Sequence, residues 1–243
     1  MQKITKYLCR IIKQAAKMTD QSFKVYSKDE FGDIVTDIDK KIESFLIDKL
    51  ERKYPEYDIV SEEFTPNRAV SSHCFVIDPI DGTGNFAGGI PLWGIQIAAI
   101  ENGDVVSSVI YLPKINEFYY ADCDGAYLND TRLEITPEIK YTKQVFAISG
   151  NSLPVIFQKG SQISHRNFRC INSASVAYAW VAAGRLNGYC LCSDKKWDYI
   201  PGMYLVQIAG GFTKDEPCHH AAATNREMLD YFDELLSESP AQK

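Results

Sequence analysis

Apolar residues recur with helical spacing in two stretches of the first fifty-four residues. In residues 4–16 they fall every three or four positions, with lysines on the other side. The same spacing returns from Thr36, where charged residues fill the opposite stripe. The apolar stripe of this second stretch is Ile38, Ile42, Phe45, Leu46 and Leu50. The pattern predicts two amphipathic helices, over residues 4–16 and 36–54, each packed on a core.

The spacing then shortens to that of strands. Two short apolar runs, at 57–60 and 74–77, each lead directly into carboxylates. Three longer runs follow, and the pair Asn102-Gly103 between the first two is typical of a tight hairpin turn. These longer strands are predicted at residues 95–100, 105–111 and 117–121. The pattern therefore indicates a sheet with acidic residues gathered at the ends of its strands.

After Pro137 strands and helices alternate. The helix predicted at 173–183 should end at Gly184, and the helix at 197–210 is apolar almost all round, so we expect it to be buried between layers. The further elements predicted are strands at 145–149, 168–170 and 188–192 and a helix at 225–236. We interpret the chain as one domain, 1–243, with an N-terminal α+β part to about 140 and a C-terminal α/β part from about 141.

Composition narrows the classes of protein. The chain has 243 residues, 45% of them hydrophobic, which is enough for a large core without disulfides. Its formal net charge of −6 argues against general nucleic-acid binding, because like charges repel. The seven cysteines are odd in number and irregularly spaced, and no apolar stretch approaches the roughly 18 residues of a membrane span. We expect a cytoplasmic protein with reduced thiols and no membrane partner.

The run from Asp78 to Phe86, Asp-Pro-Ile-Asp-Gly-Thr-Gly-Asn-Phe, carries the candidate chemistry. Two carboxylates three residues apart after an apolar strand require a counter-cation if both are buried. Hard oxygen ligands without a nearby His or Cys favour magnesium, manganese or calcium over zinc. The glycines that follow open a turn whose N–H groups can hold phosphate. Asp-Pro and Asp-Gly are also ordinary turn dipeptides, so the run alone leaves both interpretations open.

Three other acidic groups shift the balance toward a metal site. They are Asp33 with Asp39, Glu62-Glu63 and Trp197-Asp198. Taken in order with the central run, these groups resemble the signature of the inositol monophosphatase family over residues 30–212. The resemblance implies an α+β (layered α/β) fold, an αβαβα sandwich of the inositol monophosphatase and fructose-1,6-bisphosphatase type. It also implies a lithium-sensitive phosphatase, often a homodimer.

The resemblance assigns metal ligands position by position. Glu62, Asp78 and the Ile80 carbonyl would bind one magnesium ion, and Asp78, Asp81 and Asp198 a second. A third, weaker ion would be held through Glu62, and manganese is a possible substitute. The resemblance therefore implies a centre of two to three Mg²⁺ ions.

The same carry-over assigns the chemistry of hydrolysis. Glu62, Thr83 and Asp39 would be catalytic, with Thr83 orienting a metal-activated water for attack on the phosphorus. The N–H groups of Gly82 and Thr83 would bind phosphate oxygens. The substrate and phosphate contacts implied are Asp81, Gly82, Thr83, Ser173, Ala174 and Asp198.

The alcohol end of the substrate is less defined. Leu191 stands where inositol-specific members carry a glutamate, and Asn172 replaces a glycine beside the Ser173-Ala174 pair. The resemblance thus implies a small phosphorylated metabolite as substrate: an inositol phosphate, histidinol phosphate, a sugar phosphate, fructose 1,6-bisphosphate or, less favoured, a 3′-phosphonucleotide. A regulatory binding protein that keeps the fold is the alternative.

The histidines are the alternative candidates for a metal site, with zinc as the metal. His165 and the pair His219-His220 beside Cys218 offer zinc ligands. No second pair stands at finger-like spacing, which disfavours zinc.

Overall fold

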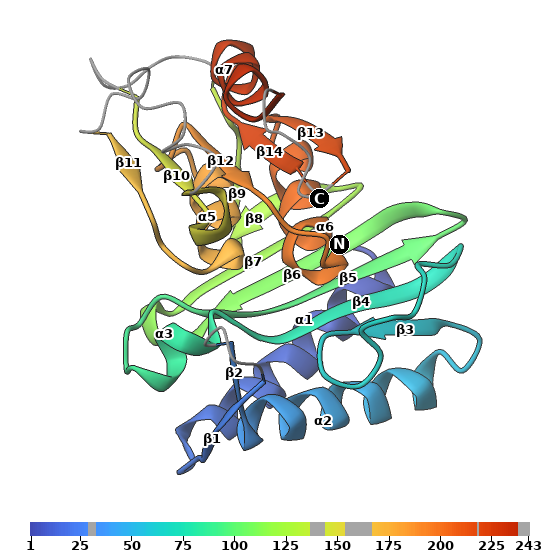
Figure 1. Ribbon diagram of the computed structural model, residues 1–243. Helices are drawn as coiled ribbons and strands as arrows, with labels where there is room; N and C mark the ends of the chain where they lie inside the picture. Colours follow the sequence, from blue (N-terminus) through green and yellow to red (C-terminus); the bar gives the residue numbers. More distant parts are fainter. Residues whose placement is uncertain (29–32, 137–143, 154–166, 218, 238–243) are drawn as a thin grey trace.

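The computed structural model describes residues 1–28, 33–136, 144–153, 167–217 and 219–237. Figure 1 shows the layers in order: a helical layer, a large sheet, a central helical layer, a smaller sheet and an outer helix. The predicted αβαβα sandwich is confirmed. The expected boundary near residue 140 falls in 137–143, outside the described residues.

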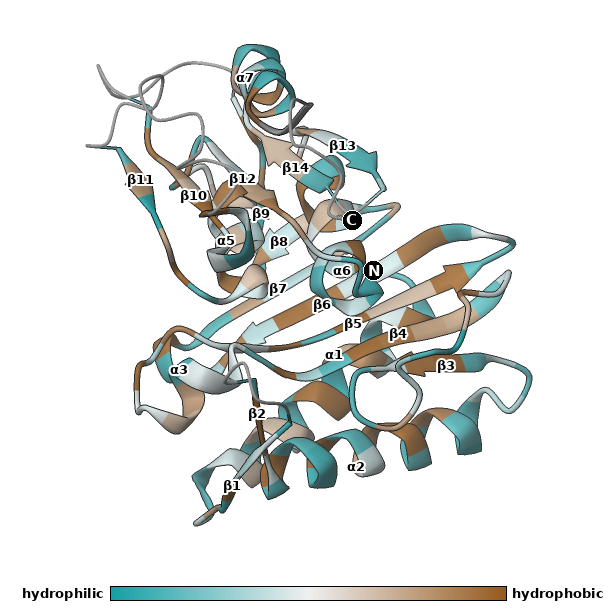
Figure 2. Ribbon diagram, in the orientation of Figure 1, coloured by the Kyte–Doolittle hydropathy of each residue, from teal (hydrophilic) through white to brown (hydrophobic). Residues whose placement is uncertain are grey.

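The first helical layer consists of α1 (Lys3–Ala16) and α2 (Asp37–Lys53), at the positions that the apolar spacing predicts. Both helices bury one stripe against the large sheet, and Figure 2 shows hydrophobic and hydrophilic segments alternating along α2. The start of α2 is fixed by a capping box, in which the Thr36 and Asp39 side chains each bond the other residue's backbone N–H. The 3₁₀ helix η1 (Lys17–Asp20) continues α1.

The large sheet has seven strands in the order β3-β4-β5-β6-β7-β8-β9. β3 is parallel to β4 and the remaining neighbours are antiparallel. Asn102 and Gly103 have φ of 55° and 89°, which confirms the predicted tight turn between β5 and β6. The strands are β3 (Asp58–Ser61), β4 (His73–Asp81), β5 (Gly94–Glu101), β6 (Asp104–Leu112), β7 (Glu117–Asp122), β8 (Gly125–Leu128) and β9 (Thr131–Leu133).

Strand β4 is longer than the apolar run from 74 to 77 indicates. It continues to Asp81, so both carboxylates of the central run belong to the strand. The pairing with β5 changes register between Asp78 and Asp81, an irregularity of the kind that re-aims side chains near active sites. The acidic residues thus lie on a rigid element.

The central layer is formed by α5 (Ala174–Ala182) and α6 (Lys196–Ile208), which contact each other between the two sheets. The predicted burial of α6 is confirmed, since its apolar residues share one core with α5 and both sheets. Gly184, with φ of 67°, follows the end of α5 as expected for a left-handed cap.

The smaller sheet has the order β11-β10-β12-β14-β13, and α7 (Arg226–Ser237) covers its outer face. Its strands are β10 (Phe146–Ile148), β11 (Phe168–Arg169), β12 (Gly188–Leu191), β13 (Phe212–Glu216) and β14 (His219–Ala223). The sequence does not indicate β13 and β14 because one is charged and the other consists of histidine and alanine. β14 is held extended by pairing with β12, and β13 by pairing with β14.

Five short elements complete the described part of the fold. β1 (Val25–Ser27) and β2 (Ile34–Thr36) form a two-stranded ribbon, and α3 (Thr83–Ala87) follows β4. The 3₁₀ helices η2 (Pro113–Ile115) and η3 (Gly150–Ser152) lie in connections. Of the helices in the described ranges, none has both the length and the apolar character needed to cross a bilayer.

Candidate active site

Three aspartates from distant parts of the chain converge below a cavity. Asp78 and Asp81 lie on β4, and Asp198 lies in the first turn of α6. Each offers a carboxylate oxygen within 4.8 Å of the others. All three are predicted metal ligands, and the structure brings them together. Grouped carboxylate oxygens are the donors that hard divalent cations prefer.

Asp81 is oriented by the start of α5. One oxygen accepts from Ala174 N at 3.0 Å, and the other accepts from Ser175 N at 2.8 Å and Ser175 Oγ at 2.5 Å. The Ser173 hydroxyl also donates to it. Gly94, the pairing partner of Asp81 on β5, leaves room for Ser175, whose Oγ would lie 2.5 Å from an added Cβ. Predicted substrate contacts Ser173 and Ala174 therefore position Asp81 in this structure.

Burial and mutual repulsion make the charged aspartates costly without a cation. Burial, and then the charges of Glu62, Asp81 and Asp198, raise the pKa of Asp78 well above its ordinary value. Burial and the Asp81 charge raise the pKa of Asp198 to about 7, although the Ser193 hydroxyl donates to Asp198 at 2.7 Å. A bound cation would relieve both effects.

Thr83 joins the aspartate group to helix α2. Its hydroxyl lies 3.0 Å from the Ile80 carbonyl oxygen and 3.2 Å from Asp39 Oδ1. Burial raises the pKa of Asp39. Gly82 has φ of 87° just before α3, a conformation that glycine adopts at low cost. The predicted catalytic pair Thr83 and Asp39 is thus in hydrogen-bond contact.

Glu62 borders the same cavity and is paired with a lysine. Lys28 Nζ lies 2.8 Å from Glu62 Oε1 and 2.5 Å from Glu63 Oε1. Burial lowers the pKa of Lys28, but the two carboxylates outweigh it and raise that pKa overall. Burial raises the pKa of Glu63 to about 7. The Lys28 ammonium therefore occupies the position of a counter-ion to this predicted ligand.

The cavity above the aspartates has a volume of about 580 Å³. Its lower end is formed by the aspartates, Glu62 and the Gly82-Thr83 turn. Asn172 and Leu191, the two positions that depart from the inositol-specific pattern, also line it. The further lining residues include Asp33, Ile34, Gly84, Ser149, Gly150, Asn151, Tyr189 and Lys195. The cavity is large enough for a phosphate with a small polyol.

Sequence reasoning missed the residues that hold the site in shape. Ser175 binds Asp81, and Ser193 binds Asp198. Glu43, fully buried on α2, accepts hydrogen bonds from the segment around Glu62. In the sequence, the hydroxyl residues Ser173 and Ser175, two positions apart, are a signal for the contact between Ser175 and Asp81. The partners of Glu43 and Ser193 follow only from contacts between separate elements.

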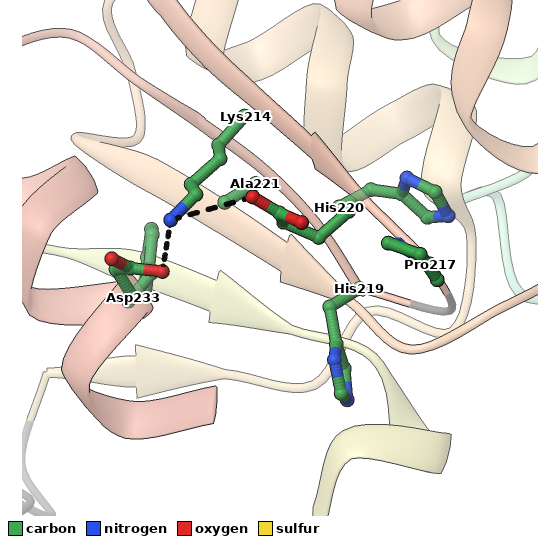
Figure 3. Close-up of a pocket in the computed structure, with 8 residues that line it drawn as sticks. Lys214, Pro217, His219, His220, Ala221 and Asp233 are labelled. Carbon is green, nitrogen blue, oxygen red and sulfur yellow. Dashed lines mark hydrogen bonds and ion pairs between the residues drawn. The ribbon is translucent and has the colours of Figure 1, made fainter. Parts of the chain in front are cut away.

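His219 and His220 lie at a second pocket, of about 420 Å³, between β13, β14 and α7. Figure 3 shows the His219 and His220 rings pointing in different directions, with Lys214 reaching Asp233. Both ring nitrogens of His220 are already engaged, Nδ1 at 2.8 Å from Asp215 and Nε2 at 2.8 Å from the Ser193 carbonyl oxygen. His165 and Cys218 lie outside the described residues.

Comparison with known proteins identifies the class as phosphatases of one family. The model of the inositol monophosphatase family matches residues 1–227, and the chain belongs to this family. The inositol-1-monophosphatase of Mesorhizobium japonicum is 34% identical over 195 residues, which span 76% of this chain and 73% of that protein. The fructose-1,6-bisphosphatase/inositol-1-monophosphatase of Thermotoga maritima is 30% identical over 208 residues, 84% of this chain and 80% of its own.

The fold has solved counterparts. The extragenic suppressor protein suhB of Bartonella henselae superimposes with a TM-score of 0.83 at 25% identity, covering 98% of this chain and 100% of that one. The layered architecture is therefore that of the family.

Proposed function

We propose that this protein hydrolyses a small phosphate monoester with magnesium as cofactor. The observation that carries the proposal is the meeting of Asp78, Asp81 and Asp198 oxygens within 4.8 Å below a cavity. These donors are hard oxygens, and their raised pKa values signal a site that lacks positive charge. The donor set therefore fits magnesium, and manganese as a substitute.

The residues that would hold two to three ions are Glu62, Asp78, the Ile80 carbonyl, Asp81 and Asp198. When bound, the ions would neutralise phosphate charge and lower the pKa of a water molecule. Thr83 would orient that water, because its hydroxyl faces Asp39 and the floor of the cavity. Asp39 would hold the Thr83 hydroxyl in place and favour transfer of the proton. Attack by water on phosphorus releases inorganic phosphate and an alcohol.

The phosphate would sit at the turn before α3. The backbone N–H groups that begin a helix have no partner within it and attract anions. Gly82 and Thr83 stand at that point, and both border the cavity. Their N–H groups would bind the phosphate oxygens, opposite the aspartates.

The alcohol part of the substrate would lie toward Asn172 and Leu191. Leu191 cannot accept a hydrogen bond from a ring hydroxyl, so specificity for inositol loses one anchor. We propose a panel of inositol 1-phosphate, fructose 1,6-bisphosphate, histidinol phosphate and a 3′-phosphonucleotide, because relatives act on more than one of these.

The test is release of inorganic phosphate from that panel with and without magnesium. Asp81→Asn should lower kcat by about a thousandfold or more, since the amide cannot both bind a cation and accept from Ser173, Ala174 and Ser175. Asp58→Asn, at an exposed position on β3, is the matched control and should leave turnover unchanged. Full activity of Asp81→Asn would refute the mechanism.

A regulatory binding role predicts the opposite pattern. A macromolecular partner would then co-purify with the protein, and this association would persist in the Asp81→Asn variant. The protein would show no magnesium-dependent turnover. Turnover that depends on both magnesium and Asp81 would exclude binding as the sole function.

A further inference from the structure

Glu43 is a buried carboxylate outside the aspartate group. It lies on α2 and is fully shielded from solvent. A buried carboxylate is costly unless its oxygens are satisfied. The hydrogen-bond partners of its two oxygens therefore show which segment of the chain Glu43 holds in place.

Three donors reach Glu43, and all come from residues 61–64. Oε1 accepts from Ser61 Oγ at 2.5 Å and from Phe64 N at 2.7 Å, and Oε2 accepts from Glu63 N at 2.9 Å. The backbone N–H groups of Glu63 and Phe64 can only donate, so each oxygen of Glu43 accepts at least one hydrogen bond.

The segment that Glu43 holds carries Glu62. The chain is fixed on both sides of Glu62, at Ser61 and at Glu63. Thr65 closes the same turn, since its hydroxyl accepts from Ser61 N at 2.9 Å and donates to the Ile59 carbonyl at 2.9 Å. The Glu62 side chain is the part of this turn that reaches the cavity.

Glu43 lies one helical turn after Asp39. Residues four apart share one face of a helix, so α2 presents both carboxylates in the same direction. Asp39 accepts from Thr83, and Glu43 accepts from the turn of Glu62. One rigid helix thus supports two separate parts of the site.

We propose that Glu43 is a positioning residue, which holds Glu62 at the distance from Asp78 that a shared cation needs. This inference rests on the proposed metal site. Glu43 touches neither the cavity nor the reacting atoms, and it acts through the backbone of residues 61–64.

The test measures magnesium affinity by titration calorimetry, which needs no turnover. Glu43→Gln keeps the shape of the side chain. Both carboxylate oxygens of Glu43 face hydrogen-bond donors, so in either orientation of the glutamine amide its NH₂ group faces a donor and one hydrogen bond is lost. We expect magnesium to bind about tenfold more weakly, equivalent to about 1.4 kcal/mol. Glu51→Gln, exposed on the same helix, is the matched control and should bind as the wild type does.

A double-mutant cycle separates positioning from general loss of stability. If Glu43 acts through Glu62, Glu43→Gln should have little effect on affinity once Glu62→Gln is present. An equal loss in both backgrounds, or unchanged affinity in Glu43→Gln, would overturn the proposal. Ser61→Ala removes one donor and should weaken binding by a smaller factor of about three. The Ser61→Ala variant replaces Glu43→Gln in the test if Glu43→Gln does not fold. Unchanged magnesium affinity in Ser61→Ala would also count against the positioning role of Glu43.

The outcomes separate this inference from the proposed function. Magnesium binding that depends on Glu43 without any phosphate release would preserve positioning and refute the phosphatase proposal. A wild-type protein that binds no magnesium would refute both.

Discussion

The Thr83 hydroxyl lies 3.2 Å from Asp39 Oδ1, and this contact joins the turn after β4 to the first turn of α2. Asp39 also accepts from Thr36 N at 2.8 Å, so the carboxylate that caps the helix is the one that faces Thr83. Helix capping and site geometry therefore share one side chain. A change at Asp39 would disturb both.

Replacement of Thr83 tests its role in orienting water. Thr83→Val keeps the shape but removes the hydroxyl, and we expect kcat to fall about 10²- to 10⁴-fold, the usual contribution of a proton-transfer group. Thr83→Ser retains the hydroxyl and should keep most of the activity. Steady-state phosphate release with the best substrate of the panel provides the measurement. Equal kcat values for the valine variant and the wild type would exclude this role.

Metal affinity should depend on pH through Asp198. Its pKa of about 7 in the metal-free protein means that a proton occupies it at pH 6, and a cation must displace that proton. Affinity for magnesium should therefore fall as pH drops below 7, by about tenfold per pH unit for each proton released. Calorimetry at pH 6 and 8, in two buffers of different ionisation enthalpy, measures the magnesium affinity and the number of protons released on binding. Affinity that stays constant over this range would contradict the assignment.

The raised pKa of Asp198 affects the stability of the metal-free protein in the opposite direction: magnesium affinity rises with pH, whereas this stability falls. Between the ordinary pKa of an aspartate and pH 7, the folded protein holds the Asp198 proton more tightly than the unfolded chain does. The metal-free protein should accordingly lose stability as pH rises through this window. Urea unfolding at pH 5 and 8, with EDTA present, tests the sign.

Asp78→Asn should stabilise the metal-free protein and abolish its response to magnesium. The substitution removes a buried charge that Glu62, Asp81 and Asp198 repel, while an amide oxygen can still accept from Ile80 N. Magnesium at a hundred times its Kd should stabilise the wild type by about 2.7 kcal/mol. For a chain of this size that corresponds to about 5–10 °C in Tm. Thermal unfolding with and without magnesium compares the two proteins, and an equal magnesium shift would argue against Asp78 as a ligand.

Gly82 and Gly84, which flank Thr83 after β4, should differ in tolerance to alanine. Gly82 has φ of 87°, and an added Cβ would lie 3.0 Å from the Ser173 Cβ, so Gly82→Ala should cost about 1–2 kcal/mol or more. At Gly84 no atom lies within 4 Å of the added Cβ, and Gly84→Ala should be neutral or stabilising by up to about 1 kcal/mol. Denaturant unfolding of both variants gives the comparison. The reverse order of stabilities would refute the conformational argument.

Much of the fold could be predicted because it is encoded locally. The apolar periodicities of α1 and α2, the nearly continuous apolar run of α6 and the Asn102-Gly103 turn each depend on neighbouring residues, and the structure confirms these elements. β13 and β14 could not be predicted, because the extended form of β14 comes from pairing with the distant strand β12, and β13 in turn pairs with β14. The β4 extension to Asp81 depends similarly on its pairing with β5.

By itself the sequence determined the candidate ligands, since the run from Asp78 to Thr83 concentrates carboxylates and a phosphate turn in six residues. Only the tertiary structure decided that Asp198 meets them, that Ser175 orients Asp81, and that Lys28 pairs with Glu62. The physical reason is separation along the chain. Contacts between residues far apart in the sequence depend on how whole layers pack. A local sequence pattern does not indicate which side chains that packing brings together.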